Sequence, residues 1–243
     1  MASVKRIYNI FRFGFGEAAR RRKRALKSEK RRATFESDLW NREGELVQRN
    51  YGSYDEYVKH QGSKLERVIQ RLRETEGEDL AEFRRRFAQC AQLEGARSVL
   101  CLGARIGTEV KALHGLGYFA VGIDLNPGEA NALVLPGDFH QLVFADSSID
   151  AVYTNTLDHV FDLNKMIGEV RRVLRPGGIF ITDVLEGFEE GFLPGAYEST
   201  HWRAVEPFLD SVAETGGFVL EGVRDLGPAR RDRWHQAVFR KPG

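Results

Sequence analysis

Apolar residues recur with two periods along the chain, and the pattern changes near residue 96. Beyond that point, short apolar runs that end at glycine or aspartate alternate with stretches of helical spacing. The expected strands cover 98–102, 118–123, 151–154, 179–184, 218–223 and 237–240, and helical spacing is clearest over 163–174 and 205–213. This alternation is typical of a doubly wound, mostly parallel sheet, and the short loop between the last two runs predicts an antiparallel edge pair.

Residues 34–95 carry apolar positions at mostly helical spacing, interleaved with Arg and Glu, and predict a helical extension. Gly77 is expected to break the long helix, and Asp79 to cap a second one. A polar aromatic cluster precedes the long helix; its members are Tyr51, Tyr54, Tyr57, His60 and Gln61. Such a cluster fits either a half-buried packing surface or the wall of a site.

Residues 1–33 form a basic arm with twelve Lys and Arg against two Glu, a formal net charge of +10. The remaining chain holds 24 basic and 33 acidic residues, a net charge of −9. Apolar residues of the arm (Val4, Ile7, Tyr8, Phe11 and Phe15) are spaced like one helical face. Three interpretations remain open: a peripheral membrane anchor, a contact with nucleic-acid phosphates, or a solvated tail.

The composition is that of a globular protein, with 42% hydrophobic and 29% charged residues in a chain of 243. Two cysteines, Cys90 and Cys101, make a disulfide framework unexpected and favour a reducing compartment. No apolar run approaches a membrane span, and the N-terminus does not read as a secretory signal. We therefore expect a cytoplasmic protein, with peripheral attachment to the inner membrane face left open by the arm. No His, Cys and carboxylate cluster has metal-ligand spacing.

A candidate ligand loop follows the first strand of the sheet, over Gly103–Gly107. Glycines allow a ligand to approach the backbone, and the next helix offers free N–H groups. Asp124 lies 21 residues after Gly103, at the end of the next strand, where a carboxylate can accept hydrogen bonds from ribose hydroxyls. Because the loop has two spaced glycines rather than three, it favours a nucleoside without phosphates.

Four segments, in order, resemble motifs of the class I S-adenosylmethionine-dependent methyltransferases. They are Val99–Val110, Gly122–Pro127, Gly137–Val152 and Glu169–Phe180. The resemblance implies a Rossmann-like methyltransferase fold with a seven-stranded, mostly parallel sheet and an N-terminal helical extension. It divides the chain into the arm (1–33), a helical cap (34–95) and a methyltransferase core (96–243), and it implies S-adenosylmethionine as the cofactor.

The resemblance also assigns cofactor-binding residues. Gly103, Ala104 and Gly107 are expected at the methionine half, Asp124 at the ribose hydroxyls, Leu125 on the adenine, Asp138 at the adenine amino group with Phe139 beside the ring, and Asn155 with Thr156 facing the methyl group. Two positions depart from the family. Cys101 stands where an acidic residue is usual, and Arg105 stands where the middle glycine is usual. The Arg105 guanidinium is placed either to bind the cofactor's carboxylate or to crowd the pocket.

An oxygen acceptor benefits from a general base, and two histidines are candidates. His159 follows the fourth strand of the motif, and His201 lies in the loop after the fifth. The leading hypothesis is O-methylation of a small-molecule or saccharide acceptor. One alternative is an RNA methyltransferase that uses the basic arm, and another is an inactive, methyltransferase-like scaffold.

Overall fold

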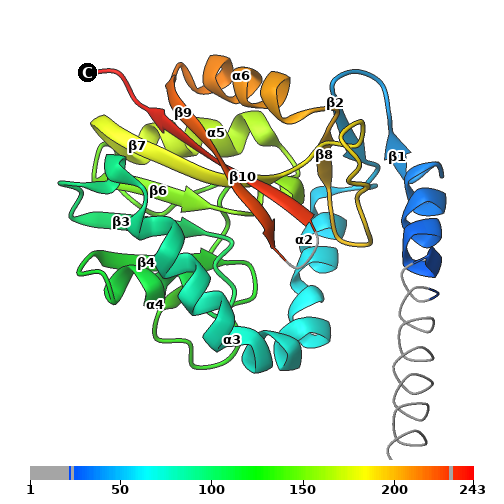
Figure 1. Cartoon of the computed structure of the whole chain (residues 1–243), viewed down its shortest axis with the longest axis horizontal. Coiled ribbons are helices and arrows are strands. Elements are labelled where there is room, and N and C mark those ends of the chain that lie inside the picture. The colour runs from blue at the N-terminus through cyan, green and yellow to red at the C-terminus, as the bar shows by residue number, and fades with distance from the viewer. Residues whose placement is uncertain (1–21, 23–24, 230–231) are drawn as a thin grey trace, which may run out of the picture.

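The computed structural model describes residue 22, residues 25–229 and residues 232–243 (Figure 1). Its centre is a seven-stranded sheet with the order β5-β4-β3-β6-β7-β10-β9. The strands are β3 (Ser98–Leu102), β4 (Phe119–Asp124), β5 (Val134–Pro136), β6 (Ile149–Thr154), β7 (Leu174–Leu185), β9 (Val219–Ala229) and β10 (Asp232–Arg240). Strands β3 to β7 are parallel, and β10 runs antiparallel to both β7 and β9. The predicted fold class and the antiparallel edge pair are confirmed.

Helices cover both faces of this sheet (Figure 1). They are α4 (Thr108–His114), α5 (Leu163–Val173) and α6 (Val205–Gly216), with short 3-10 turns at Ala91–Leu93 and Leu157–His159. Alternate side chains of each strand enter separate cores, as the pleat requires. Leu100 and Leu102 pack in the core that also holds α5 and α6, whereas Val99 and Cys101 pack in the core under α4. Sequestration of both faces is typical of a parallel sheet.

The cap consists mainly of two helices, α2 (Tyr54–Gly62) and α3 (Lys64–Ala88). The side chain of Ser53 caps α2 by accepting a hydrogen bond from the Glu56 N–H. The prediction that Gly77 breaks the long helix is wrong, because α3 is continuous through it. A glycine inside a helix costs about 1 kcal/mol, and the apolar face of α3, which buries Phe87 in the core, outweighs that cost.

A second, three-stranded sheet lies beside the cap and was absent from the helical interpretation of residues 34–95. Its strands are β1 (Trp40–Asn41), β2 (Leu46–Arg49) and β8 (Thr200–Trp202), all antiparallel. Strand β2 pairs with β1 on one side and with β8 on the other, where Leu46 pairs with Trp202 from far along the chain. Such a non-local pairing leaves no periodic signal in the local sequence.

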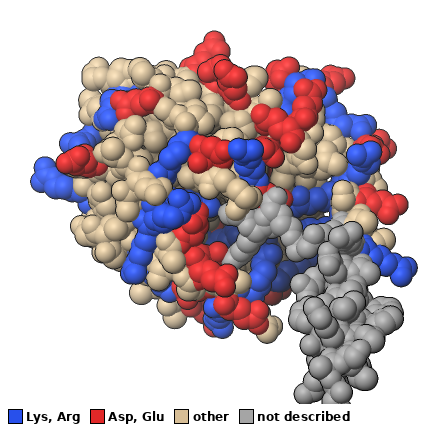
Figure 2. Space-filling view, in the orientation of Figure 1, with Lys and Arg blue, Asp and Glu red and all other residues tan. Residues whose placement is uncertain are grey.

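Residues 25–35 of the basic arm are helical, whereas the apolar positions Val4 to Phe15 lie outside the described residues. No helix in the described part of the chain is long and apolar enough to cross a membrane. On the face drawn in Figure 2, Lys and Arg are interspersed with Asp and Glu rather than gathered in one patch.

Candidate functional site

The loop after β3 bends sharply so that its backbone faces the end of β6. Gly103 has a φ of +71°, and a Cβ added there would lie 2.5 Å from the Thr156 Oγ1. A side chain at residue 103 would therefore be strained in its backbone and would collide with β6. Gly107, with a φ of +80°, is the N-cap of α4 and packs near Val134 rather than lining a cavity.

Asp124 ends β4 directly beside this loop. Its Oδ2 accepts a hydrogen bond from the Arg105 backbone N–H (3.0 Å), and its Oδ1 accepts one from the Asn126 N–H (2.8 Å). Burial raises the pKa of Asp124, although these hydrogen bonds oppose the rise. Each carboxylate oxygen retains a second lone pair. Asp124 can therefore accept hydrogen bonds from two neighbouring hydroxyl groups, as the sequence predicts.

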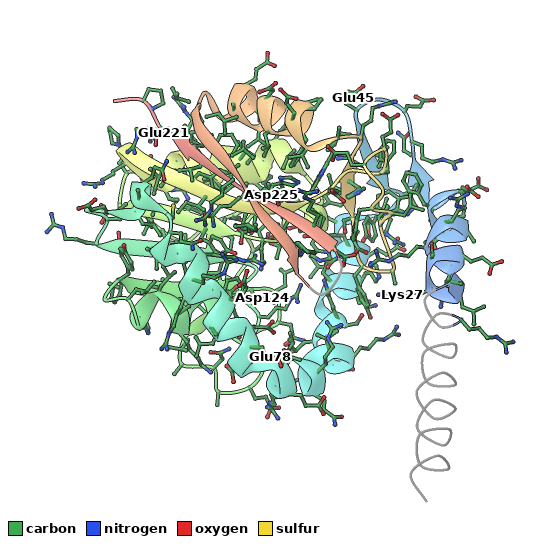
Figure 3. All side chains as sticks on the ribbon, in the orientation of Figure 1. Lys27, Glu45, Glu78, Asp124, Glu221 and Asp225 are labelled. Atoms are coloured by element: carbon green, nitrogen blue, oxygen red, sulfur yellow. The ribbon has the colours of Figure 1, made fainter. Side chains whose placement is uncertain are left out.

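A pocket opens in front of Asp124, and we call it the inner pocket. Figure 3 labels Asp124 near the middle of the molecule, close to α3. The core contributes Gly103, Arg105, Asp124, Leu125, Asn126, Phe139, Thr156 and His159 to the lining, and the cap contributes Tyr57, Gln61, Lys64 and Leu65. The structure thus brings six of the predicted cofactor residues together: Gly103, Arg105, Asp124, Leu125, Phe139 and Thr156.

Asp138 lies next to this pocket but is held by the cap. The Tyr54 hydroxyl donates to its Oδ2, and His140 donates to its Oδ1 from Nδ1 (2.9 Å) and from the backbone N–H (2.8 Å). The Asp162 N–H donates to His140 Nε2, which places the ring proton on Nδ1. Burial alone would raise the pKa of Asp138, but the bonds from His140 and Tyr54 lower it to about 2. Any adenine amino group would share this carboxylate with Tyr54.

A wider depression, the outer cleft, adjoins the inner pocket and shares Gly103, Arg105 and His159 with it. The predicted residues Ala104 and Asn155 line it, together with Glu109, Asp158 and Glu198. The two hollows therefore meet at the loop after β3. Of the predicted methionine and methyl-transfer residues, Ala104 and Asn155 line the outer cleft and Thr156 lines the inner pocket. The predicted nucleoside residues Asp124, Leu125 and Phe139 line the inner pocket.

A half-buried pair of bases, Lys64 and His159, lies where the two hollows meet. Lys64 Nζ lies 2.5 Å from His159 Nε2, and His159 Nδ1 lies 2.9 Å from the Tyr197 carbonyl oxygen. Because the carbonyl can only accept, Nδ1 carries the imidazole proton and Nε2 accepts from Lys64. Burial, followed by the nearby Arg105, lowers the pKa of Lys64, and burial lowers the pKa of His159.

Two acidic residues lie beside this pair. Burial, followed by the charge of Glu198, raises the pKa of Asp158. Glu198 itself keeps a lowered pKa, because the charge of Lys64 and hydrogen bonds from the backbone outweigh its burial. The hydrogen bonds come from the N–H groups of Gly195 and Tyr197. A proton gained by Lys64 is therefore stabilised by the charge of the Glu198 carboxylate.

Arg105 occupies the position of the family's middle glycine with a φ of +47°. The left-handed backbone explains why glycine is usual here, since a side chain costs roughly 1–2 kcal/mol in this region. Its guanidinium lines both hollows, and no hydrogen bond from it to another described residue is present. The described structure thus leaves this cation available to an anionic ligand group.

His201, the second predicted base, lies elsewhere. Its ring is fully buried in β8, where Nε2 contacts the Phe192 carbonyl oxygen (3.1 Å), and Nδ1 has no partner in the described part of the chain. Burial lowers its pKa to about 4. His201 lines neither the inner pocket nor the outer cleft. The structure therefore brings His159, but not His201, to the candidate site.

Sequence reasoning did not single out Lys64 or Glu109 as site residues. Both had a local signal: Lys64 begins the long helix directly after the polar aromatic cluster, and Glu109 follows the glycine loop by two residues. Neither position reveals by itself that its side chain is buried in the site. Among the residues that the structure describes, no group of His, Cys, Asp and Glu is arranged to hold a metal ion.

Comparison with known proteins places this site in context. Residues 100–182 match the family described as "Methyltransferase domain". Malonyl-[acyl-carrier protein] O-methyltransferase 1 of Coxiella burnetii is 30% identical over 123 residues, which are 46% of this chain and 42% of that protein. Sterol 24-C-methyltransferase erg6 of Aspergillus fumigatus is 41% identical over 64 residues, 26% of this chain and 15% of that protein. The chain spans less than half the length of the curated relatives it matches.

Solved structures share the fold. The 1,6-didemethyltoxoflavin-N1-methyltransferase of Burkholderia thailandensis, solved with 1,6-didemethyltoxoflavin and S-adenosylhomocysteine, has a TM-score of 0.65. It is 17% identical, and the match covers 84% of this chain and 98% of that chain. Phosphoethanolamine N-methyltransferase 2 of Haemonchus contortus has a TM-score of 0.52 at 16% identity, over 69% of this chain and 53% of that one.

Proposed function

Residues 100–182 belong to the class I S-adenosylmethionine-dependent methyltransferase family, and on that premise we propose that this chain binds S-adenosylmethionine and methylates an oxygen of a small-molecule acceptor. The observation that carries the proposal is Asp124, a half-buried carboxylate with two remaining lone pairs that lines the inner pocket. Leu125 and Phe139 flank it and supply apolar surface for an adenine ring.

The residues present fit this cofactor. Gly103, without a side chain, keeps the loop open where the inner pocket meets the outer cleft. Asp124 accepts from the ribose hydroxyls, and Arg105 directs its guanidinium charge at the cofactor's carboxylate. Ala104 and Asn155 bound the space in which the methionine half and the methyl group lie.

When bound, S-adenosylmethionine supplies a methyl group on a positively charged sulfur. The chain's part is to hold an acceptor in line with that group and to exclude water. An oxygen acceptor must also lose a proton. We assign this proton to the Lys64–His159 pair, because burial favours the neutral amine of Lys64 and the His159 Nε2 holds that amine in place. His201 has no role in this account.

Two solved relatives support a small acceptor. One was solved with 1,6-didemethyltoxoflavin and the other with phosphomonomethylethanolamine. A saccharide remains one member of this class. The RNA alternative depends on the basic arm, and the mixed charges on the face in Figure 2 offer no continuous basic surface to extend it.

Calorimetric titration with S-adenosylhomocysteine tests the cofactor assignment. We expect the wild-type protein to bind and Asp124→Asn to bind about 100-fold more weakly, because hydrogen bonds to a charged group each contribute about 1.5–3 kcal/mol. Asp210→Asn, at an exposed position of α6, is the matched control and should bind like wild type. Absence of binding by the wild-type protein, or equal binding by Asp124→Asn, would contradict the proposal.

Competitive acetylation followed by mass spectrometry tests the assignment of the proton acceptor. Lys64 should react in its neutral form at a pH well below that of Lys59, an exposed lysine of α2. Identical pH profiles for the two lysines would remove Lys64 from the mechanism. A screen of small-molecule acceptors with radiolabelled S-adenosylmethionine would then compare wild type with Lys64→Met. The methylation rate of the variant should no longer depend on deprotonation of residue 64.

A further inference from the structure

Glu109 is a buried carboxylate that the account above does not use. It is the second residue of α4, it is 6% exposed, and it lines the outer cleft beside Gly103, Ala104 and Asn155. Its recorded hydrogen bond is to its own backbone N–H. No Lys, Arg or His of residues 25–229 or 232–243 forms an ion pair with it.

A carboxylate in this position is unfavourable unless something compensates its charge. Removing an ionised group from water without a partner costs several kcal/mol, and the usual outcome is a shifted pKa. Burial indeed raises the pKa of Glu109 to about 7. Glutamine or leucine would fill the same volume without that cost, so the acid suits a cationic partner that enters the cleft.

The location of Glu109 indicates what that partner is. Its charge acts on Cys101 in β3 and on Tyr153 in β6, so the carboxylate lies near two adjacent strands of the sheet. Cys101 stands where the resemblance to the methyltransferase motif implies an acidic residue, and its thiol is fully buried. The acidic group lost from β3 therefore has a counterpart on the next helix, facing the cleft beside the same loop.

We propose that Glu109 binds the α-ammonium group of the cofactor's methionine half and so replaces the carboxylate that β3 lacks at Cys101. Glu109 would then bind the ammonium group of the methionine half, and Arg105 would bind its carboxylate. This inference rests on the proposed function, because the ammonium group belongs to S-adenosylmethionine. A cationic acceptor could offer the same chemistry, and the probes below distinguish the two sources.

The test compares two probes by calorimetry: S-adenosylhomocysteine and its analogue in which hydrogen replaces the α-amino group. Wild-type protein should prefer S-adenosylhomocysteine by about 10- to 100-fold, the range of a charge-assisted hydrogen bond. Glu109→Gln should bind both probes equally and about as weakly as wild type binds the analogue. Circular dichroism checks that this near-isosteric variant is folded.

The double variant Cys101→Asp with Glu109→Gln provides the sharper result, because it returns the acid to β3. It should recover at least part of the preference for the amino group, whereas Cys101→Asn with Glu109→Gln should not. Retention of the full preference by Glu109→Gln would overturn the inference while leaving the proposed function intact. Equal binding of the two probes by wild type would overturn it in favour of a cation from the acceptor. Absence of binding by wild type would instead refute the proposed function.

Discussion

The inner pocket and the outer cleft differ in how their residues are drawn from the chain. The loop and the acid of the inner pocket, Gly103 and Asp124, come from consecutive strands that pair in parallel. The junction with the outer cleft instead joins Lys64 to His159, 95 residues apart, and His159 to Tyr197, 38 residues apart. The proposed nucleoside residues thus lie in one compact motif, whereas the proposed proton acceptor depends on how the cap packs on the core.

The largest effect should come from breaking the loop that both hollows share. Gly103→Ala combines a left-handed backbone with a collision against Thr156, and should lower the free energy of unfolding by about 3–4 kcal/mol. Gly77→Ala is the matched control. It lies inside α3 with open space around it, and should raise stability by about 1 kcal/mol. Urea denaturation of both variants checks this, and a harmless Gly103→Ala would contradict the loop geometry.

The second largest effect is a pH-dependent change in the free energy of unfolding, which arises from Glu109 in the outer cleft. The folded pKa of Glu109 is about 7, above its unfolded value of 4.5, so the folded state binds the proton more tightly. The contribution to stability is therefore complete below pH 4.5 and is lost as the pH rises toward 7, by at most ~3 kcal/mol. The groups that act on Glu109 are Asp79 of α3, Cys101 of β3, Arg105 of the loop, Asp124 of β4 and Tyr153 of β6.

Glu109→Gln should remove this part of the decline in stability between pH 5 and pH 8, measured without cofactor. Asp158 also has a raised pKa and remains in the variant, so some decline should persist. An unchanged profile would mean that Glu109 ionises in the folded protein as it does in the unfolded chain.

Substitution of Arg105 distinguishes the two interpretations of its guanidinium, namely that it binds the cofactor's carboxylate or that it crowds the pocket. Arg105→Gly relieves the backbone at a φ of +47° and removes the guanidinium from both hollows. If the guanidinium binds the cofactor's carboxylate, affinity for S-adenosylhomocysteine should fall about tenfold, or about 1.4 kcal/mol. If it crowds the pocket, affinity should rise. Calorimetry at one ionic strength gives the sign, and the account above predicts the fall.

The smallest effect is expected where the cap meets the inner pocket. Tyr54→Phe removes the hydroxyl that donates to Asp138 and should cost about 1 kcal/mol at neutral pH. Asp138 has a folded pKa of about 2, so its contribution is present above pH 3.8 and is lost as the pH falls toward 2. The difference between wild type and Tyr54→Phe should therefore shrink in acid.

Tyr57→Phe is the control for that variant. The Tyr57 hydroxyl is buried without a hydrogen-bond partner among the described residues, so its removal should leave stability unchanged or increase it. Equal losses from the two substitutions would show that the Tyr54 hydroxyl contributes nothing specific.

The same contrast explains what could be predicted from the sequence. Strand and helix alternation predicted six of the seven strands and the antiparallel edge pair, but not the three-residue strand β5. Gly103 and Asp124 indicated where the inner pocket lies, because each of these signals lies within one short segment. Strand β2 was missed because its pairing with β8 involves Trp202, far along the chain, and the two-residue strand β1 pairs in turn with β2. The break at Gly77 was wrong because burial of the helix, which a local propensity does not record, decided the outcome.

The two candidate histidines, His159 and His201, show what the sequence could not predict about the functional site. His159 and His201 were equally plausible bases in the sequence, since both follow strands of the core. Their difference arises from tertiary packing: the ring of one meets Lys64 at the site, and the ring of the other is enclosed near Phe192. Lys64 and Glu109 were missed for the same reason, because burial and proximity to other charges give them their chemistry.

A crystal structure of the protein with S-adenosylhomocysteine tests the central claim most directly. The account predicts that the ribose hydroxyls donate to Asp124, that the adenine lies between Leu125 and Phe139, and that the amino acid half extends past Gly103 into the outer cleft. A nucleoside bound away from Asp124, or one whose amino acid half points toward Asp138, would contradict it.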